Sequence, residues 1–244
     1  MNIETIILRN IKWSDSSLIT HALTDEYGKI SIMTKGAYRK KENVLPNFEL
    51  FSITSFELGK GENIFYFNEV DESVSFQNLH SNPLDFRLSC IACEILLKSL
   101  EENFRVPNIY PLTKSFILNL SDFKNKLLLL SAWILKYVSF MGYEPLIDAE
   151  GESLILFNEG VVHESEFHFD SDYQPITNSE KNILQYILYN KFSDIAKIEL
   201  DFDNSLLFLN LCIKYFGWTF DIQKLNSYVE FMDFIKWWSR NDFN

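Results

Sequence analysis

The chain has 244 residues and a formal net charge of -12 at pH 7, from 22 Lys and Arg against 34 Asp and Glu. Hydrophobic residues make up 47 % and charged residues 23 %, a composition that is typical of a globular protein and excludes a disordered one. Three cysteines provide no disulfide framework, which indicates a reducing compartment.

The N-terminal third carries the period-2 alternation of half-buried strands. We predict strands over residues 5–12, 18–24, 29–34, 48–58 and 64–70. Gly28 stands in the turn before the third strand, where it can supply a positive φ. Five short strands within about 70 residues are typical of a small closed barrel.

From residue 83 onward the hydrophobic period becomes helical. Residues 144–177 interrupt it with Gly, acidic residues and a strand-like piece at 154–157. The most apolar stretch, residues 127–140, is shorter than the ~20 residues that a membrane span needs. No signal peptide is recognisable either, so we expect a cytoplasmic protein without membrane contact. Helices are predicted over residues 86–100, 108–120 and 122–141, from Thr177 or Ser179 to 188, and over 205–216 and 229–238.

The predicted fold class is therefore α+β and multi-domain. A β-barrel domain occupies residues 1–79. A helical domain occupies residues 80–244 and carries a non-helical insert at about 144–177.

Motifs of known catalytic chemistry are missing from the chain. No glycine-rich phosphate loop and no Gly-x-Ser-x-Gly elbow is present, and the four histidines are scattered. Cys90-x-x-Cys93 lies inside a predicted helix and has no second ligand pair, so we interpret these cysteines as small buried hydrophobes. The sequence predicts a protein that is not an enzyme.

One end of the chain departs from the acidic background. Residues 1–45 carry seven basic and five acidic residues, whereas the remainder carries 15 basic and 29 acidic ones. The connection after the third strand combines charge for phosphates with a ring on which a base can stack. A solvated surface loop and a nucleic-acid contact both stay open as interpretations. The candidate DNA-binding residues are Lys35, Arg39, Arg9, Tyr38, Lys40 and Lys41.

A family resemblance appears in the order of several short motifs. Residues 7–9, 15–19, 23–30, 35–39 and 45–50, together with Phe140-Met141-Gly142-Tyr143-Glu144-Pro145-Leu146, resemble the bacterial recombination mediator family RecO. The resemblance implies an OB-fold, a nucleic-acid-binding barrel, followed by a helical domain with a zinc-ribbon-like insert. It also implies DNA binding in recombinational repair after DNA damage.

The resemblance implies partners and site residues as well. The partners are single- and double-stranded DNA, RecR, single-stranded-DNA-binding protein and, indirectly, RecA. The implied role is to anneal complementary strands and to help load RecA in the nucleoid. Of the DNA-binding candidates, the family motif supports Lys35 and Arg39. Charge and proximity suggest the others, Arg9, Tyr38, Lys40 and Lys41.

The insert departs from the family pattern, in which two cysteine pairs bind zinc. The corresponding positions here hold Asp148, Gly151, His163 and Glu166, and Gly151 has no side chain to offer. We therefore expect no zinc and no other cofactor. Because the folding energy of a metal site is missing, packing must hold the insert together. The candidates for this packing are Leu154, Ile155, Phe157 and Phe167.

A second class of function stays open. Residues 46–244 carry 14 more acidic than basic residues, which suits an acidic helical scaffold for proteins with the barrel as a docking module. A groove for the acidic tail of single-stranded-DNA-binding protein would place a cation beside apolar side chains. Lys214 and Lys236 have aromatic neighbours, although ordinary surface lysines explain the same pattern.

Overall fold

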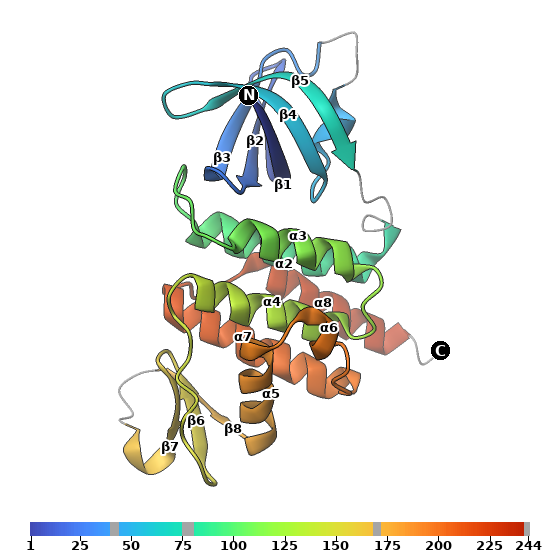
Figure 1. Cartoon of the computed structure of the whole chain (residues 1–244). Coiled ribbons are helices and arrows are strands. Elements are labelled where there is room, and N and C mark those ends of the chain that lie inside the picture. Colours follow the sequence, from blue (N-terminus) through green and yellow to red (C-terminus); the bar gives the residue numbers. More distant parts are fainter. Residues whose placement is uncertain (40–43, 75–80, 168–171, 242–244) are drawn as a thin grey trace. The chain divides into compact units, whose positions relative to one another are not determined.

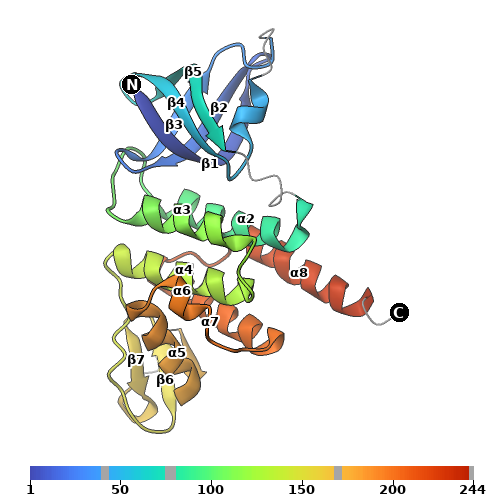
Figure 2. The ribbon, with the colours of Figure 1, turned by 45° about the vertical axis from the view of Figure 1, so that its right-hand side comes forward.

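The computed structural model describes residues 1–39, 44–74, 81–167 and 172–241 (Figure 1). Its chain forms two compact units, Met1–Ser121 and Asp122–Asn244. The first unit contains a β-barrel with two helices, and the second contains helices with a small sheet (Figures 1 and 2). None of the helices in these described ranges is long and apolar enough to cross a membrane.

The first unit is built on a closed barrel in the order β1-β2-β3-β5-β4. All neighbouring strands are antiparallel except β3 and β5, which pair in parallel through Ile32 and Phe65. This arrangement is the five-stranded barrel of an OB-fold. It confirms the small closed barrel that the strand pattern predicted and the OB-fold that the family resemblance implied. The strands are β1 (Asn2–Trp13), β2 (Ser17–Thr24), β3 (Gly28–Thr34), β4 (Ile53–Lys60) and β5 (Phe65–Val74).

The barrel interior is filled by the apolar side chains that alternate along its strands. Ile7, Ile30 and Ile32 are fully buried there, and Phe48 stacks on Phe56 with 4.8 Å between ring centroids. The strand predictions for residues 5–12, 18–24, 29–34 and 64–70 are confirmed within a few residues.

The prediction of a strand from residue 48 is wrong over its first five residues. Leu45–Phe48 forms a 3-10 helix, η1, with Pro46 in its first turn. Phe51 has a φ of 65°, a left-handed conformation that no regular strand contains. β4 therefore begins only at Ile53. The amide of Asn10 donates to the Phe48 carbonyl oxygen at 2.6 Å, so η1 is held against β1.

Two helices complete the first unit, α2 (Pro83–Ser99) and α3 (Ile109–Leu120). The Asn82 side chain caps α2 by accepting from the backbone N–H groups of Leu84 and Asp85. The connection between the helices joins the barrel, because the Asn103 N–H donates to the Lys29 carbonyl at 2.8 Å. The buried Lys29 ammonium in turn donates to the Leu97 carbonyl at 2.9 Å.

An electrostatic cluster fixes the same connection to β2 and β3. Glu102 accepts hydrogen bonds from Ser31 and lies 3.2 Å from the His21 ring nitrogen Nδ1. Burial raises the pKa of Glu102, but the hydrogen bonds of His21 and Ser31 and the charges of His21 and Lys29 outweigh it and lower this pKa overall. Burial also lowers the pKa of Lys29. The ionised carboxylate is thus the form that the fold favours.

The second unit is organised around α4 (Lys126–Phe140). Trp133 and Tyr137 of this helix are fully buried and stack with ring centroids 5.3 Å apart. Its N-cap is Asn125, so the helix begins four residues after the predicted start at residue 122. It ends one residue before the predicted end at residue 141, and Gly142, with a φ of 90°, follows. The remaining elements are β6 (Leu154–Phe157), β7 (Gly160–His163), η2 (Glu164–Glu166), β8 (Tyr173–Ile176), α5 (Asn178–Tyr189), α6 (Phe192–Ile195), α7 (Phe202–Phe220) and α8 (Asn226–Asn241).

The non-helical insert contains an antiparallel sheet in the order β7-β6-β8. The insert is packed as predicted: Leu154, Ile155 and Phe167 are buried, and the rings of Phe157 and Phe167 are 5.4 Å apart. The compact units divide after Ser121, since α2 and α3 lie with the barrel. The predicted domain boundary after residue 79 stays a prediction.

Candidate nucleic-acid interface

Strand pairing brings the predicted basic connection to one end of the barrel, beside the ends of four strands. Trp13 at the end of β1 pairs with Ser17 at the start of β2. Leu18 in turn pairs with Thr34 at the end of β3. Met33 pairs with Tyr66 near the start of β5. Side chains up to 54 positions apart in the sequence therefore lie along one rim. We call this the rim surface, and it consists of Lys12, Trp13, Lys35, Tyr38, Arg39 and Tyr66.

Backbone hydrogen bonds shape the connection that leaves β3. Gly36 has a φ of 69°, and the Arg39 N–H donates to the Gly36 carbonyl at 2.9 Å, which closes a turn. The Tyr38 N–H donates to the Ser16 carbonyl at 3.1 Å. The connection is thereby tied to the turn between β1 and β2, next to Trp13.

Two lysines of the rim surface lie over aromatic rings. The Lys12 ammonium is 5.5 Å from the Tyr38 ring centroid, and the Lys35 ammonium is 5.2 Å from that of Tyr66. Both distances are within the range of a cation–π interaction. The rings stay accessible, since Tyr38 is 43 % and Tyr66 is 40 % exposed. The surface thus alternates positive charge with aromatic rings.

The cations of the rim surface form no ion pair within the described ranges of the chain. Elsewhere in the first unit Lys114 pairs with Glu4 at 2.8 Å and Arg105 pairs with Asp25 at 3.6 Å. In the described part of the chain, no acidic oxygen lies within 4.0 Å of the charged groups of Lys12, Lys35 or Arg39. Their charge is therefore available to a phosphate.

The structure places the predicted site residues as follows. Lys35, Tyr38 and Arg39 lie together on the rim surface, whereas Arg9 pairs with His21 further along β1. Four residues separate Arg9 from Trp13, which corresponds to about 13 Å along a strand. Lys40 and Lys41 lie outside the described residues. The roles of all six in DNA binding stay predictions.

Three residues of the rim surface were not predicted from the sequence. Lys12 and Trp13 stand just before a turn, and an exposed tryptophan at a strand end is a signal that sequence reasoning could have used. Tyr66 gave no such signal, because only the parallel pairing of β3 with β5 brings it to Lys35.

The insert positions that the family resemblance suggested for metal ligands lie close together. Asp148, His163 and Glu166 line a shallow hollow of about 570 Å³, and a Cβ on Gly151 would lie 3.8 Å from His163 Cδ2. One of these donors already has a hydrogen-bond partner. His163 Nδ1 already accepts from the Ser165 N–H, and the described residues contain no group of three His, Cys, Asp or Glu side chains that could hold a metal.

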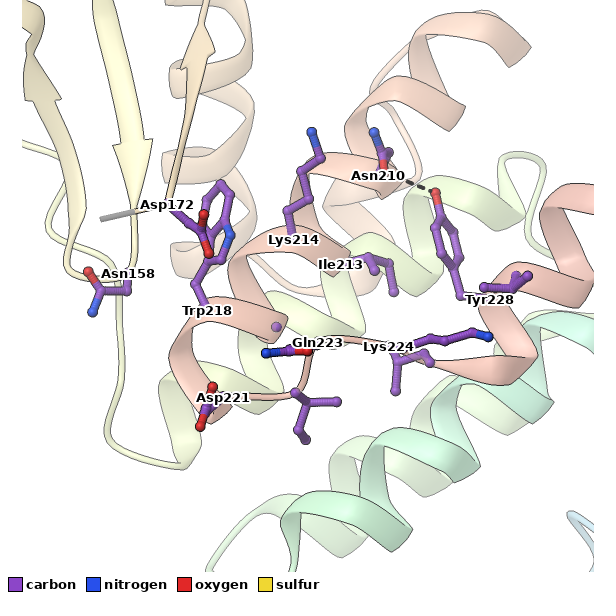
Figure 3. Close-up of a pocket in the computed structure, with 14 residues that line it drawn as sticks. Asn158, Asp172, Asn210, Ile213, Lys214, Trp218, Asp221, Gln223, Lys224 and Tyr228 are labelled. Carbon is purple, nitrogen blue, oxygen red and sulfur yellow. Dashed lines mark hydrogen bonds between the residues drawn. The ribbon is translucent and has the colours of Figure 1, made fainter. Parts of the chain in front are cut away.

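A second pocket, also of about 570 Å³, lies in the second unit, between α7 and the start of α8 (Figure 3). Lys214 projects into it and donates to Gln174 Oε1 at 2.7 Å, beside the indole of Trp218. The Tyr228 hydroxyl donates to Asn210 Oδ1 at 3.3 Å, and burial raises the pKa of Tyr228 to about 12. The other predicted lysine, Lys236, lies outside this lining and pairs with Asp233.

Of the two motif cysteines, Cys93 is buried as predicted, and Cys90 is only partly buried. Burial and the neighbouring Cys90 raise the pKa of the Cys93 thiol well above its ordinary value. A high thiol pKa opposes redox or metal chemistry.

Comparisons with known proteins give one family over most of the chain. The family model "Recombination protein O N terminal" matches residues 1–76, and "Recombination protein O C terminal" matches residues 87–228. A protein of Thermoanaerobacter sp. (strain X514), named DNA repair protein RecO, is 26 % identical over 146 residues, which are 59 % of each chain.

Further relatives carry the same name. That of Caldanaerobacter subterraneus subsp. tengcongensis is 23 % identical over 206 residues, which cover 81 % of this chain and 83 % of the relative. That of Symbiobacterium thermophilum is 27 % identical over 150 residues, which cover 61 % of this chain and 59 % of the relative. The matched region thus spans less than two thirds of some relatives and more than four fifths of another.

Proposed function

Since the chain belongs to the RecO family of recombination proteins, we propose that it serves recombinational DNA repair by binding DNA on the rim surface of its barrel. The observation that carries the proposal is a group of cations, Lys12, Lys35 and Arg39, that form no ion pair with any residue that the structure describes, in a protein of net charge -12. Phosphate contacts supply most of the affinity of a nucleic-acid-binding protein.

The finer role that we propose is that of a non-catalytic mediator. The protein binds single- and double-stranded DNA, anneals complementary strands and helps to load RecA together with RecR. Its partners include single-stranded-DNA-binding protein, and its place is the cytoplasm, in association with the nucleoid. The barrel supplies the DNA contact, and the acidic second unit is left for protein partners.

A salt titration of binding to labelled single-stranded DNA tests the DNA contact. Log affinity should fall linearly with log salt concentration, with a slope of about -0.7 per neutralised phosphate. The double variant Lys35→Ala with Arg39→Ala removes two cations, so its slope should be flatter by about 1.4.

The matched control is Lys98→Ala with Lys197→Ala, which lowers the net charge equally but removes lysines that already pair with Glu94 and Asp194. We expect the control to keep the wild-type slope. If wild-type protein does not bind DNA at low salt, the DNA proposal fails. The alternative, an acidic protein-binding scaffold, then explains the chain better.

We also propose that the insert works without zinc and is held by its apolar core. Metal analysis of protein purified without chelator tests this, and the expected zinc content is far below one ion per chain. Stoichiometric zinc that is lost in the His163→Ala variant would overturn the proposal.

For the tail of single-stranded-DNA-binding protein we propose the pocket that contains Lys214 and Trp218. An acidic peptide that ends in Phe needs a cation beside an apolar wall, and this lining offers both. A labelled peptide of this kind should bind the wild type and lose at least tenfold in affinity with Lys214→Glu. Lys197→Glu, on a lysine outside the pocket, is the control. Equal losses for both variants would contradict the assignment.

A further inference from the structure

The rim surface exposes more aromatic area than phosphate binding requires. Trp13 is 56 % exposed, and the Tyr38 and Tyr66 rings are 43 % and 40 % exposed. Trp13 and Tyr66 stand on strands, and the backbone of Tyr38 is tied to Ser16 by a hydrogen bond. Rings on such a rigid support lose little conformational freedom when a ligand stacks on them.

The position of the Tyr66 ring depends on a glycine. A Cβ on Gly61 would lie 2.9 Å from Tyr66 Cε2, so the ring lies directly against the turn between β4 and β5. The Lys35 ammonium lies over the same ring at 5.2 Å from its centroid. Tyr66 is therefore a positioned ring and not a side chain that sweeps through solvent.

We propose that Trp13, Tyr38 and Tyr66 form a stacking platform for unpaired bases, which makes the rim surface selective for single-stranded DNA. This inference rests on the proposed function. A duplex offers its phosphates to Lys12, Lys35 and Arg39 as a single strand does, but its bases are already stacked on both faces. Only a single strand can place bases on the rings.

The dimensions of the rim suit this role. From β1 across β2 and β3 to β5 there are three strand spacings, or about 14 Å. That length corresponds to about four nucleotides at a stacked rise of 3.4 Å, the lower end of site sizes for an OB-fold.

In this proposal, the two lysines of the cation–π pairs change their contacts when a single strand binds. Lys12 and Lys35 lie over the rings on which bases would stack. Each ammonium moves from its ring to a phosphate as a base takes its place. The ring exchanges one partner for another, and the lysine gains an ionic contact.

Alanine variants of the full chain test the platform with a fluorescein-labelled 15-nucleotide single strand and the matching duplex at one salt concentration. Trp13→Ala and Tyr66→Ala should each weaken single-strand binding by about 5- to 100-fold. Duplex binding should change by less than about twofold, because no charge is removed. Trp13→Phe should retain most of the affinity. Phe104→Ala is the control, since Phe104 is a ring of similar exposure, 59 %, away from the rim.

Fluorine NMR of 5-fluorotryptophan-labelled protein supplies a second readout, which does not depend on comparing the affinities of variants. The Trp13 resonance, assigned through Trp13→Phe, should shift with the single strand and not with the duplex. Equal losses for single strand and duplex, or no loss in either, would overturn the platform. If the wild type binds and Lys35→Ala with Arg39→Ala weakens it, but Trp13→Ala does not, stacking fails while the proposed function stands.

Discussion

Two glycines with the same backbone conformation allow a sharp test of how the helical connection is held on the barrel. Gly28 and Gly36 both have a φ of 69°. A Cβ on Gly36 would meet nothing within 4 Å, whereas one on Gly28 would lie 2.1 Å from the Phe104 carbonyl oxygen. The stability change of Gly36→Ala therefore measures only the cost of the left-handed backbone. That of Gly28→Ala measures the same cost plus that of a collision with the main chain at Phe104.

The expected magnitudes follow from what the collision displaces. The left-handed conformation costs a non-glycine residue about 1 kcal/mol, which both variants share. Moving the connection away from Gly28 also breaks the hydrogen bond from the Asn103 N–H to the Lys29 carbonyl and loosens those of Glu102. At about 1 kcal/mol for each of these two losses, Gly28→Ala should destabilise by about 3 kcal/mol.

Urea unfolding of the full chain, followed by circular dichroism, measures the free energies. Native-state hydrogen exchange localises the change, with faster exchange expected for residues 101–105 in Gly28→Ala alone. Destabilisation of the two variants within 0.5 kcal/mol of each other would refute the reasoning. It would mean that the connection can move away from the added methyl group without a loss of stability.

Three further outcomes are expected. Gly160→Ala should destabilise the second unit by about 2 kcal/mol or more and expose the amides of β6 and β7 to exchange, because its Cβ would lie 2.2 Å from the Leu146 carbonyl oxygen. Glu102→Gln should lower stability by about 0.5–1 kcal/mol at pH 7, since this carboxylate is partly exposed. Because the folded pKa of Glu102 lies below the unfolded value, that difference is fully present above the unfolded pKa and should vanish in urea titrations as the pH falls through the lowered folded pKa. The Cys93 thiol, buried and with a raised pKa, should react with a thiol reagent only after unfolding, as mass mapping of labelled peptides would show.

The barrel was predictable because its signal is local. Alternation along each strand marks which side chains face the core, and Gly28 marks a turn where a positive φ is needed. The segment before β4 was not predictable in the same way. In the sequence, Phe48 and Phe56 fall on the same face of one alternating pattern. In the structure, Phe51 with its left-handed backbone lies between them, and the Phe48 ring reaches the core from η1.

The candidate site was predictable only in part, for a related reason. Lys35, Tyr38 and Arg39 lie within five positions of the sequence, so their closeness along the chain alone places them near one another. Tyr66 joins them through a parallel strand pair, and Trp13 through a hairpin register that no local pattern encodes. The charge pattern therefore pointed to the surface that we propose for DNA, and the three-dimensional register supplies the rings on which we propose that a base stacks.

The acidic background of the protein limits the range over which the rim surface can act. At 0.15 M salt the screening length is about 8 Å, so a phosphate at the rim would interact with the nearby rim cations and little with distant carboxylates. At 0.01 M salt this length is about 30 Å, and much of the net charge of -12 then repels the same phosphate. The log–log plot of affinity against salt should therefore be straight above about 0.05 M and flatten below about 0.02 M. A plot that stays straight to the lowest salt concentration would mean that repulsion by the protein's net negative charge does not weaken the binding of phosphates at the rim. In that case, contact between the rim cations and nearby phosphates would not explain the proposed DNA binding of an acidic protein.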